Sequence, residues 1–113
     1  MCKMKNGEEE KIKSILTNPK SAAIKAMLEK DHAIDCIFLL HMKRGKWKEA
    51  KTFMRENGLT LSDGTFRARM IEIAGLGLAT PIRIDPLKKY YVITELGEKV
   101  AEFLLGFFDK ISP

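Results

Sequence analysis

His32 and Cys36 have the spacing of two metal ligands on one face of a helix, because residues four apart lie one above the other. His41 lies too far along the chain to complete such a site, and no nearby segment supplies a clear third ligand. The alternative is a histidine at the start of a helix beside a buried cysteine. The lack of a third ligand favours this alternative, so we expect no metal and no other cofactor.

Motifs of enzymatic nucleophiles and phosphate-binding loops are missing from the sequence. The segment GLGLATP, 75–81, is no GxGxxG loop after a strand, and there is no Walker-type loop. No serine or cysteine lies in a nucleophile motif. We therefore expect that the protein is not an enzyme.

Positive charge is concentrated in one segment. Of the 20 lysines and arginines, eight fall within residues 41–70, together with three of the 15 acidic residues. A local excess of this kind is typical of a surface that binds a polyanion such as nucleic acid. A solvated, lysine-rich helix face is the alternative, so the argument depends on the other residues of the segment.

The stretch LSDGTFRARMIEIAGLGL, 61–78, has the pattern of a helix that enters a DNA groove. Ser62 is suited to cap the helix. At about 100° per residue, the large apolar residues Phe66, Met70 and Ile73 share one buried side. Gly64 and Ala68 lie opposite, and both are small enough to let the backbone approach DNA.

Arg67 is the residue of this helix that we expect to read a base, because a guanidinium can donate two hydrogen bonds to O6 and N7 of guanine. Thr65 lies on the other flank. Arg69 projects nearer the core, where it is either a phosphate contact or the partner in a structural ion pair. Two residues oppose sequence-specific reading: Asp63 repels phosphate, and Ile71 faces outward, toward a thymine methyl group or a protein.

Basic residues of two neighbouring segments are placed to contact phosphates. Lys46 and Lys48 begin the preceding helix, and Lys88 and Lys89 lie in a predicted turn. Trp47 is either a core anchor, the more typical role, or a base-stacking residue. The full set expected to contact DNA is Arg44, Lys46, Lys48, Gly64, Thr65, Arg67, Ala68, Arg69, Lys88 and Lys89.

Apolar periodicity and cap residues predict a mainly α fold with a small β-hairpin, an α+β protein. The expected helices cover 7–17, a segment from Pro19 with Asn18 as cap, 32–43 with Asp31 as cap, 46–58, 63–74 and 95–110 with Thr94 as cap. In the hairpin, Ile82 and Ile84 alternate with Arg83, and Tyr91 and Ile93 alternate with Tyr90 and Val92, as in half-buried strands. The turn between them is DPLKK, 85–89, with Pro86 presetting its backbone.

This order of elements resembles the winged helix-turn-helix. Two segments are similar to regulators of the MarR and PadR kinds: Leu61-Ser62-x-Gly64-Thr65-Phe66-x-x-Arg69-Met70-x-x-Ile73, followed by Gly77-Leu78, resembles their recognition helix, and Tyr91-x-Ile93-Thr94-x-x-Gly97 resembles their second wing strand and the start of the C-terminal helix. The resemblance implies a single domain with a helical extension, 1–30, a core, 31–94, and a C-terminal helix, 95–113.

The function implied is that of a transcription regulator that binds double-stranded DNA. Helix 63–74 would enter the major groove, and the wing, 85–89, would contact the backbone or the minor groove. The alternative is a winged-helix module that binds protein within a transcription or replication complex, its basic face being incidental.

Apolar residues are in surplus in the last helix. One helix stripe can turn only part of this set inward, and exposed patches of this size usually mark an interface. We expect a homodimer built mainly by this helix, assisted by the N-terminal helix; the alternative is that helices within 8–30 cover the set in the same chain. The residues concerned are Phe103, Leu104, Phe107, Phe108 and Ile111.

The sequence predicts a cytoplasmic protein without a membrane partner. No apolar run approaches the roughly 20 residues of a membrane span. The segment MCKMKNGEEEKIK, 1–13, has no apolar stretch after its lysines, unlike a secretory signal. Cys2 and Cys36 form no CxxC pair, which favours a reducing compartment.

Overall fold

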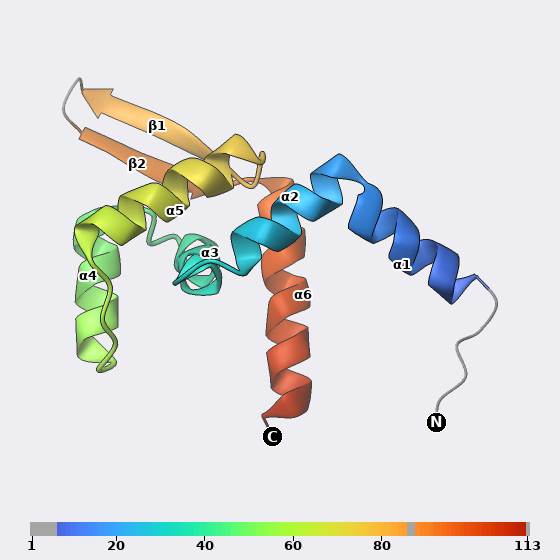
Figure 1. The fold of residues 1–113 in the computed structure, drawn as a ribbon. Coiled ribbons are helices and arrows are strands. Elements are labelled where there is room, and N and C mark those ends of the chain that lie inside the picture. Colours follow the sequence, from blue (N-terminus) through green and yellow to red (C-terminus); the bar gives the residue numbers. More distant parts are fainter. Residues whose placement is uncertain (1–6, 86–87, 113) are drawn as a thin grey trace.

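The computed structural model describes residues 7–85 and 88–112, and these form a mainly helical α+β fold with one two-stranded antiparallel sheet (Figure 1). This is the class that the sequence predicts. Residues 86–87 of the predicted turn, including Pro86, lie outside the described residues, as does Cys2. The elements are α1 Glu8–Thr17, α2 Pro19–Leu28, α3 Ala33–His41, α4 Trp47–Glu56, α5 Asp63–Gly75, β1 Ala79–Asp85, β2 Lys88–Ile93 and α6 Glu95–Ile111.

Three helices begin at the cap residues that the sequence predicts. The Asn18 side chain accepts hydrogen bonds from two backbone N–H groups of the first turn of α2, and Pro19 is the first helical residue. Ser62 Oγ accepts from the Thr65 backbone N–H at 3.1 Å. Thr94 Oγ1 accepts in the same way from the N–H of Gly97 at 3.1 Å. The structure therefore confirms these three caps. The sequence could predict them because each cap depends only on residues within one turn.

The start of α3 differs from the prediction. Asp31 does not cap it; the N-cap is His32, with φ 60°, and no side chain caps the helix. A tight turn, in which the Ala33 N–H donates to the Lys30 carbonyl at 3.1 Å, shifts the cap by one residue. The Asp31 carbonyl instead accepts a hydrogen bond from Arg69.

The end of α3 also comes earlier than residue 43. Lys43 has φ 64°, a left-handed conformation that a helix cannot continue. The Lys43 N–H donates to the Leu40 carbonyl and the Arg44 N–H donates to the Leu39 carbonyl, at 3.0 and 2.8 Å. These are the two closing bonds of a Schellman motif, here with lysine where glycine is usual.

The core is built around α3, which contacts α5, α6 and β2 and lies between α4 and α6 in Figure 1. Its residues Ile37, Leu39 and Leu40 are almost fully buried. Phe66, Met70 and Ile73 form the buried side of α5, as the sequence predicts. The residues buried in this core are Met27, Ala33, Cys36, Ile37, Leu39, Leu40, Ala50, Met54, Phe66, Met70, Ile73, Leu78, Ala79, Tyr91, Ile93 and Ala101.

The burial of β1 follows the predicted alternation only in part. Arg83 pairs with Lys89, and both lie on the face that carries buried Tyr91. Ile82 pairs with Tyr90 on the other face, where both are half-buried, but Ile84 is 60% exposed, so the interpretation of Ile84 as a buried residue is wrong. The strand begins at a buried Ala79. Because side chains alternate between faces, Arg83 lies on the same face as Ala79.

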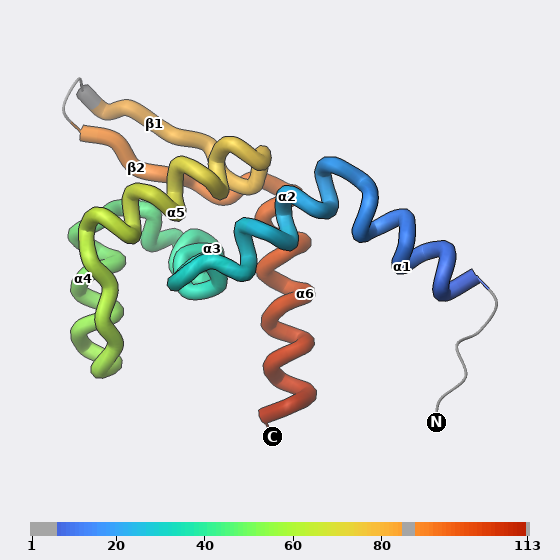
Figure 2. Tube along the Cα trace, viewed as in Figure 1, coloured from blue at the N-terminus to red at the C-terminus, as the bar shows by residue number. Residues whose placement is uncertain are grey.

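Two helices extend away from this body. The C-terminal half of α6 projects beyond α3, and the tube in Figure 2 shows α1 leaving the body beyond α2. None of the residues of α1 is buried within the described chain. The described helices are all too short or too polar to span a bilayer.

Candidate functional site

The outward side of α5 is formed by small and charged residues. Gly64 is exposed and has open space around its Cα, so the backbone is accessible there. Thr65 and Ala68 are half-buried, and the Thr65 hydroxyl accepts a hydrogen bond from Ser62 Oγ at 2.9 Å. Ile71 is 59% exposed, which confirms that it faces outward. The predicted small outward residues are therefore accessible at Gly64 and only partly so at Ala68.

Arg67 is the exposed cation of this side. Its side chain is 74% exposed, and Nε donates a hydrogen bond to Asp63 Oδ1 at 3.0 Å. Ion pairs this exposed contribute little to stability, so the guanidinium can exchange Asp63 for another acceptor. Asp63, which is expected to repel phosphate, is thus the hydrogen-bond partner of this arginine.

Arg69 is predicted to be either a phosphate contact or the partner in a structural ion pair, and its contacts are those of an ion pair. Nε donates to the Asp31 carbonyl at 2.8 Å and Nη1 to Glu72 Oε1 at 2.7 Å, and the side chain is 16% exposed. Glu72 also pairs with Lys30 at 3.1 Å. Partial burial raises the pKa of Glu72, but the hydrogen bonds from Lys30 and Arg69 outweigh it and lower that pKa. Nε is thus engaged by Asp31, before α3, and Nη1 by Glu72 of α5, so these contacts favour the structural role of Arg69 over a contact with DNA phosphate.

A pocket of about 380 Å³ lies between α5 and the hairpin, and we call it the α5–hairpin pocket. Three cations from three elements surround it: Arg67 of α5, Arg83 of β1 and Lys89 of β2. Its remaining lining is apolar, and Trp47 there packs against Phe66 with ring centroids 5.2 Å apart. Trp47 is therefore a half-buried anchor against the core. The lining residues are Trp47, Phe66, Arg67, Ile71, Arg83, Lys89 and Tyr91.

Arg83 is the basic residue that the sequence reasoning missed. It was expected on the outer face of its strand, whereas pairing with Lys89 directs it to the face that borders α5. Counting the strand alternation from Leu78 and Ala79, rather than from the isoleucines, would have found it.

The other basic residues of the predicted set lie elsewhere. Lys46 Nζ lies 5.1 Å from the ring centroid of Tyr90, and the Arg44 guanidinium lies 5.2 Å from that of Phe53. Lys48 is exposed on the first turns of α4. Lys88 is the first residue of β2, so the lysines expected in the turn belong to the strand.

His32 is the N-cap residue of α3, and Cys36 follows one turn further along the same helix. His32 Nδ1 lies 2.8 Å from Asp35 Oδ2, and Cys36 is fully buried. Burial, with a smaller contribution from Asp35, raises the pKa of the Cys36 thiol to about 12. Within the described residues, no three metal-ligating side chains are grouped.

The surplus of apolar residues on α6 is exposed. Phe103 is 78% exposed, and Phe107, Phe108 and Ile111 also lie open to solvent, whereas Leu104 packs against the core of its own chain. Leu104 is therefore removed from the interface set, because it lies on the inward side of the helix. The alternative that helices within 8–30 cover this surface is wrong, since α1 itself exposes its apolar residues Ile12, Ile15 and Leu16.

The chemistry available on the α5–hairpin face is anion binding. Its three cations have one described carboxylate partner, Asp63, and that pair is exposed.

Comparison with known proteins finds no matching family model, no similar curated protein and no similar solved structure.

Proposed function

We propose that the protein is a winged helix-turn-helix regulator of transcription that binds double-stranded DNA. In this proposal α5 enters the major groove, and the β1–β2 hairpin is the wing, which contacts the backbone or the minor groove. The observation that carries the proposal is the convergence of Arg67, Arg83 and Lys89 on one face shared by α5 and the hairpin.

The shape of α5 supports this placement. Its 13 residues span about 20 Å, and an α-helix, about 10–12 Å across with its side chains, fits a major groove about 12 Å wide. The helix buries one side in its own core and leaves Gly64 and Arg67 accessible. In the complex, Arg67 would exchange its exposed pair with Asp63 for two hydrogen bonds to a guanine.

We also propose that the active form is a homodimer in which the exposed face of α6 covers the same face of a second copy. Palindromic sites are read by two-fold dimers, and α6 leaves the body away from the hairpin (Figure 1), so an interface there would leave both DNA-binding faces free. The unburied helix α1 is a second candidate contact of the same dimer. A helix of only 10 residues is marginal alone in water, so contact with a partner chain would stabilise it.

Ile71 favours one alternative. It is a large apolar residue, 59% exposed, on the side of α5 that would face DNA. A protein partner that covers Ile71 would give the chain a role as an interaction module instead.

Selection of bound sequences from a random duplex pool, followed by binding measurements on variants, tests the proposal. Arg67→Ala should cost about 1–3 kcal/mol on the preferred site and blur the preference at one base pair. Lys48→Ala should weaken binding to all sequences equally and lower the salt slope by about one unit. Arg55→Ala is the matched control, because Arg55 is exposed in the last turn of α4, outside the proposed face. Unchanged affinity and base preference in Arg67→Ala would instead favour the interaction module.

A further inference from the structure

Two cations that line the α5–hairpin pocket, Arg83 and Lys89, have no carboxylate partner among the described side chains. Arg83 and Lys89 are direct partners across the two strands. Like charges placed opposite each other in this way destabilise a sheet. No carboxylate among the described side chains pairs with either, and the Lys89 ammonium contacts only the ring of Tyr91, 5.3 Å from its centroid. Both side chains are exposed, so solvent weakens their repulsion, and an anion bound between the two groups would remove it.

We propose that Arg83 and Lys89 form a subsite for one backbone phosphate of the DNA strand that passes between α5 and the hairpin. This inference rests on the proposed function. The phosphate held there would fix the position of the strand beside α5 and so set the distance between Arg67 and the base edges. Arg83 is thus a second DNA-binding arginine, distinct from Arg67 because it contacts the backbone only.

The floor of the pocket favours a phosphate over an unstacked base. The rings of Phe66 and Tyr91 line it, but these residues are only 3% and 8% exposed, so neither offers a free face for stacking. Apolar groups beneath the two cations lower the local dielectric constant and strengthen their attraction for an anion. The volume of about 380 Å³ leaves room for a phosphate with several waters, each of which takes about 30 Å³.

Salt-dependent binding to two duplexes, one selected and one unrelated, tests the subsite. Arg83→Ala and Lys89→Ala should each weaken binding to both duplexes by the same factor, roughly tenfold near 0.1 M salt, and lower the salt slope by about one unit. The base preference should stay unchanged, and Arg55→Ala should bind as the parent does. The melting temperature of Arg83→Ala should not fall, since the change relieves a like-charge pair; a merely structural arginine would lower it.

Trp47 provides a readout that does not need DNA. It is the single tryptophan of the chain and lines the pocket, so its fluorescence reports occupancy. We expect inorganic pyrophosphate to change this fluorescence saturably in the parent protein and not in Arg83→Ala. A parent that binds duplexes while both variants retain its affinity and salt slope would overturn the subsite and leave the proposed function intact. A parent that binds no duplex would overturn the proposed function and the DNA origin of the phosphate, and pyrophosphate would then show whether the pocket binds phosphate from another source.

Discussion

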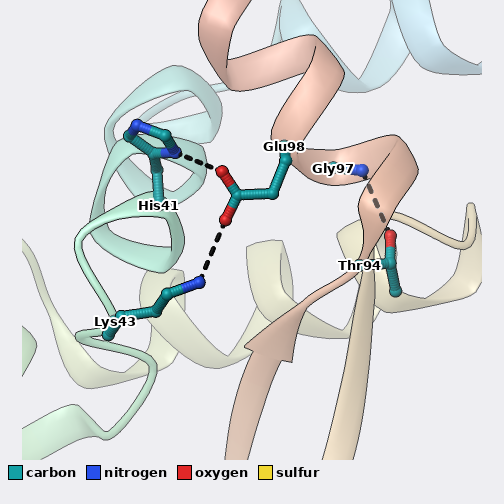
Figure 3. Close-up of polar contacts among 5 residues, drawn as sticks. All are labelled: His41, Lys43, Thr94, Gly97 and Glu98. Atoms are coloured by element: carbon teal, nitrogen blue, oxygen red, sulfur yellow. Dashed lines mark hydrogen bonds and ion pairs between the residues drawn. The ribbon is translucent and has the colours of Figure 1, made fainter.

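Glu98 Oε2 lies 2.7 Å from Nδ1 of His41, a contact that joins the first turns of α6 to the end of α3 (Figure 3). The other carboxylate oxygen, Oε1, accepts a hydrogen bond from Lys43 Nζ at 3.0 Å. Lys43 is the residue whose left-handed backbone ends α3. Glu98 therefore holds both the last residue of one helix and the turn that follows it.

The contact predicts a pH-dependent stability. The hydrogen bond from Lys43, aided by that from His41, lowers the pKa of Glu98. A carboxyl group with a lower pKa in the folded state stabilises the fold above the ordinary glutamate range, and this contribution is lost as the pH falls through the lowered pKa. Glu98→Gln should thus lower the melting temperature at about pH 7, and this difference should shrink as the pH falls through the lowered pKa and the parent becomes protonated as well.

Thermal unfolding of the two proteins over a series of pH values, from neutral pH down into the acidic range, measures this effect. Glu102→Gln is the control, because Glu102 is exposed one turn further along α6, and its melting temperature should match that of the parent. A difference between parent and Glu98→Gln that stays equally large across the whole series would contradict the prediction.

Gly97 packs against the backbone of Leu78, and this close approach predicts a large effect of one methyl group. A Cβ on Gly97 would lie 2.1 Å from the Leu78 carbonyl oxygen, which also accepts a hydrogen bond from the Thr94 N–H. Neither backbone can move without disturbing the junction of β2 and α6. Gly97→Ala should lower the free energy of unfolding by about 1–3 kcal/mol or more, as measured by urea denaturation.

Gly106 supplies the matched control on the same helix. A Cβ there meets no atom within 4 Å, so alanine adds helix propensity without a clash. Gly106→Ala should raise the free energy of unfolding by about 0.5–1 kcal/mol. Equal effects of the two substitutions would mean that the packing at Gly97 is not a constraint.

The parts of the fold that the sequence predicts correctly are those decided by local chemistry. Asn18, Ser62 and Thr94 cap their helices through N–H groups two or three residues away. The start of α3 is different, because the Asp31 carbonyl is engaged by Arg69, which lies 38 residues further along the chain. Contacts at that separation leave no pattern in the sequence.

The candidate site shows the same limit. The periodicity of α5 predicts its buried side, yet it leaves two roles open for Arg69. The partner Glu72 is three residues away on the same helix, but Asp31 is brought to Arg69 only by the tertiary fold. The position of Arg83 depends on the residue at which β1 enters the sheet, and a shift of one residue reverses its face. The pairing with the neighbouring strand decides which side chains of a strand face inward, whereas the buried side of a helix follows from its own sequence.

Burial of Cys36 predicts an inert thiol. Because its pKa is raised to about 12, almost no thiolate exists near pH 8, and the fully buried sulfur excludes reagents. In the Cys2→Ser variant, a disulfide reagent should leave the folded protein unlabelled and modify Cys36 fully in urea. Rapid labelling of the folded variant would show that the core opens around α3.

If the exposed face of α6 forms the homodimer, one charged residue placed on that face should prevent dimerisation. Phe103 is 78% exposed and Phe107 51%, so aspartate at either position should leave the monomer folded while placing an unpaired charge in the proposed interface. Sedimentation should show a dimer for the parent at a concentration on the order of tens of micromolar, and a monomer for each variant.

Ile84→Asp is the control, since Ile84 is 60% exposed on the hairpin, away from α6. It should remain dimeric, and circular dichroism should show that all three variants are folded. A parent that sediments as a monomer at this concentration would exclude the dimer, and the α6 face would then require a different partner.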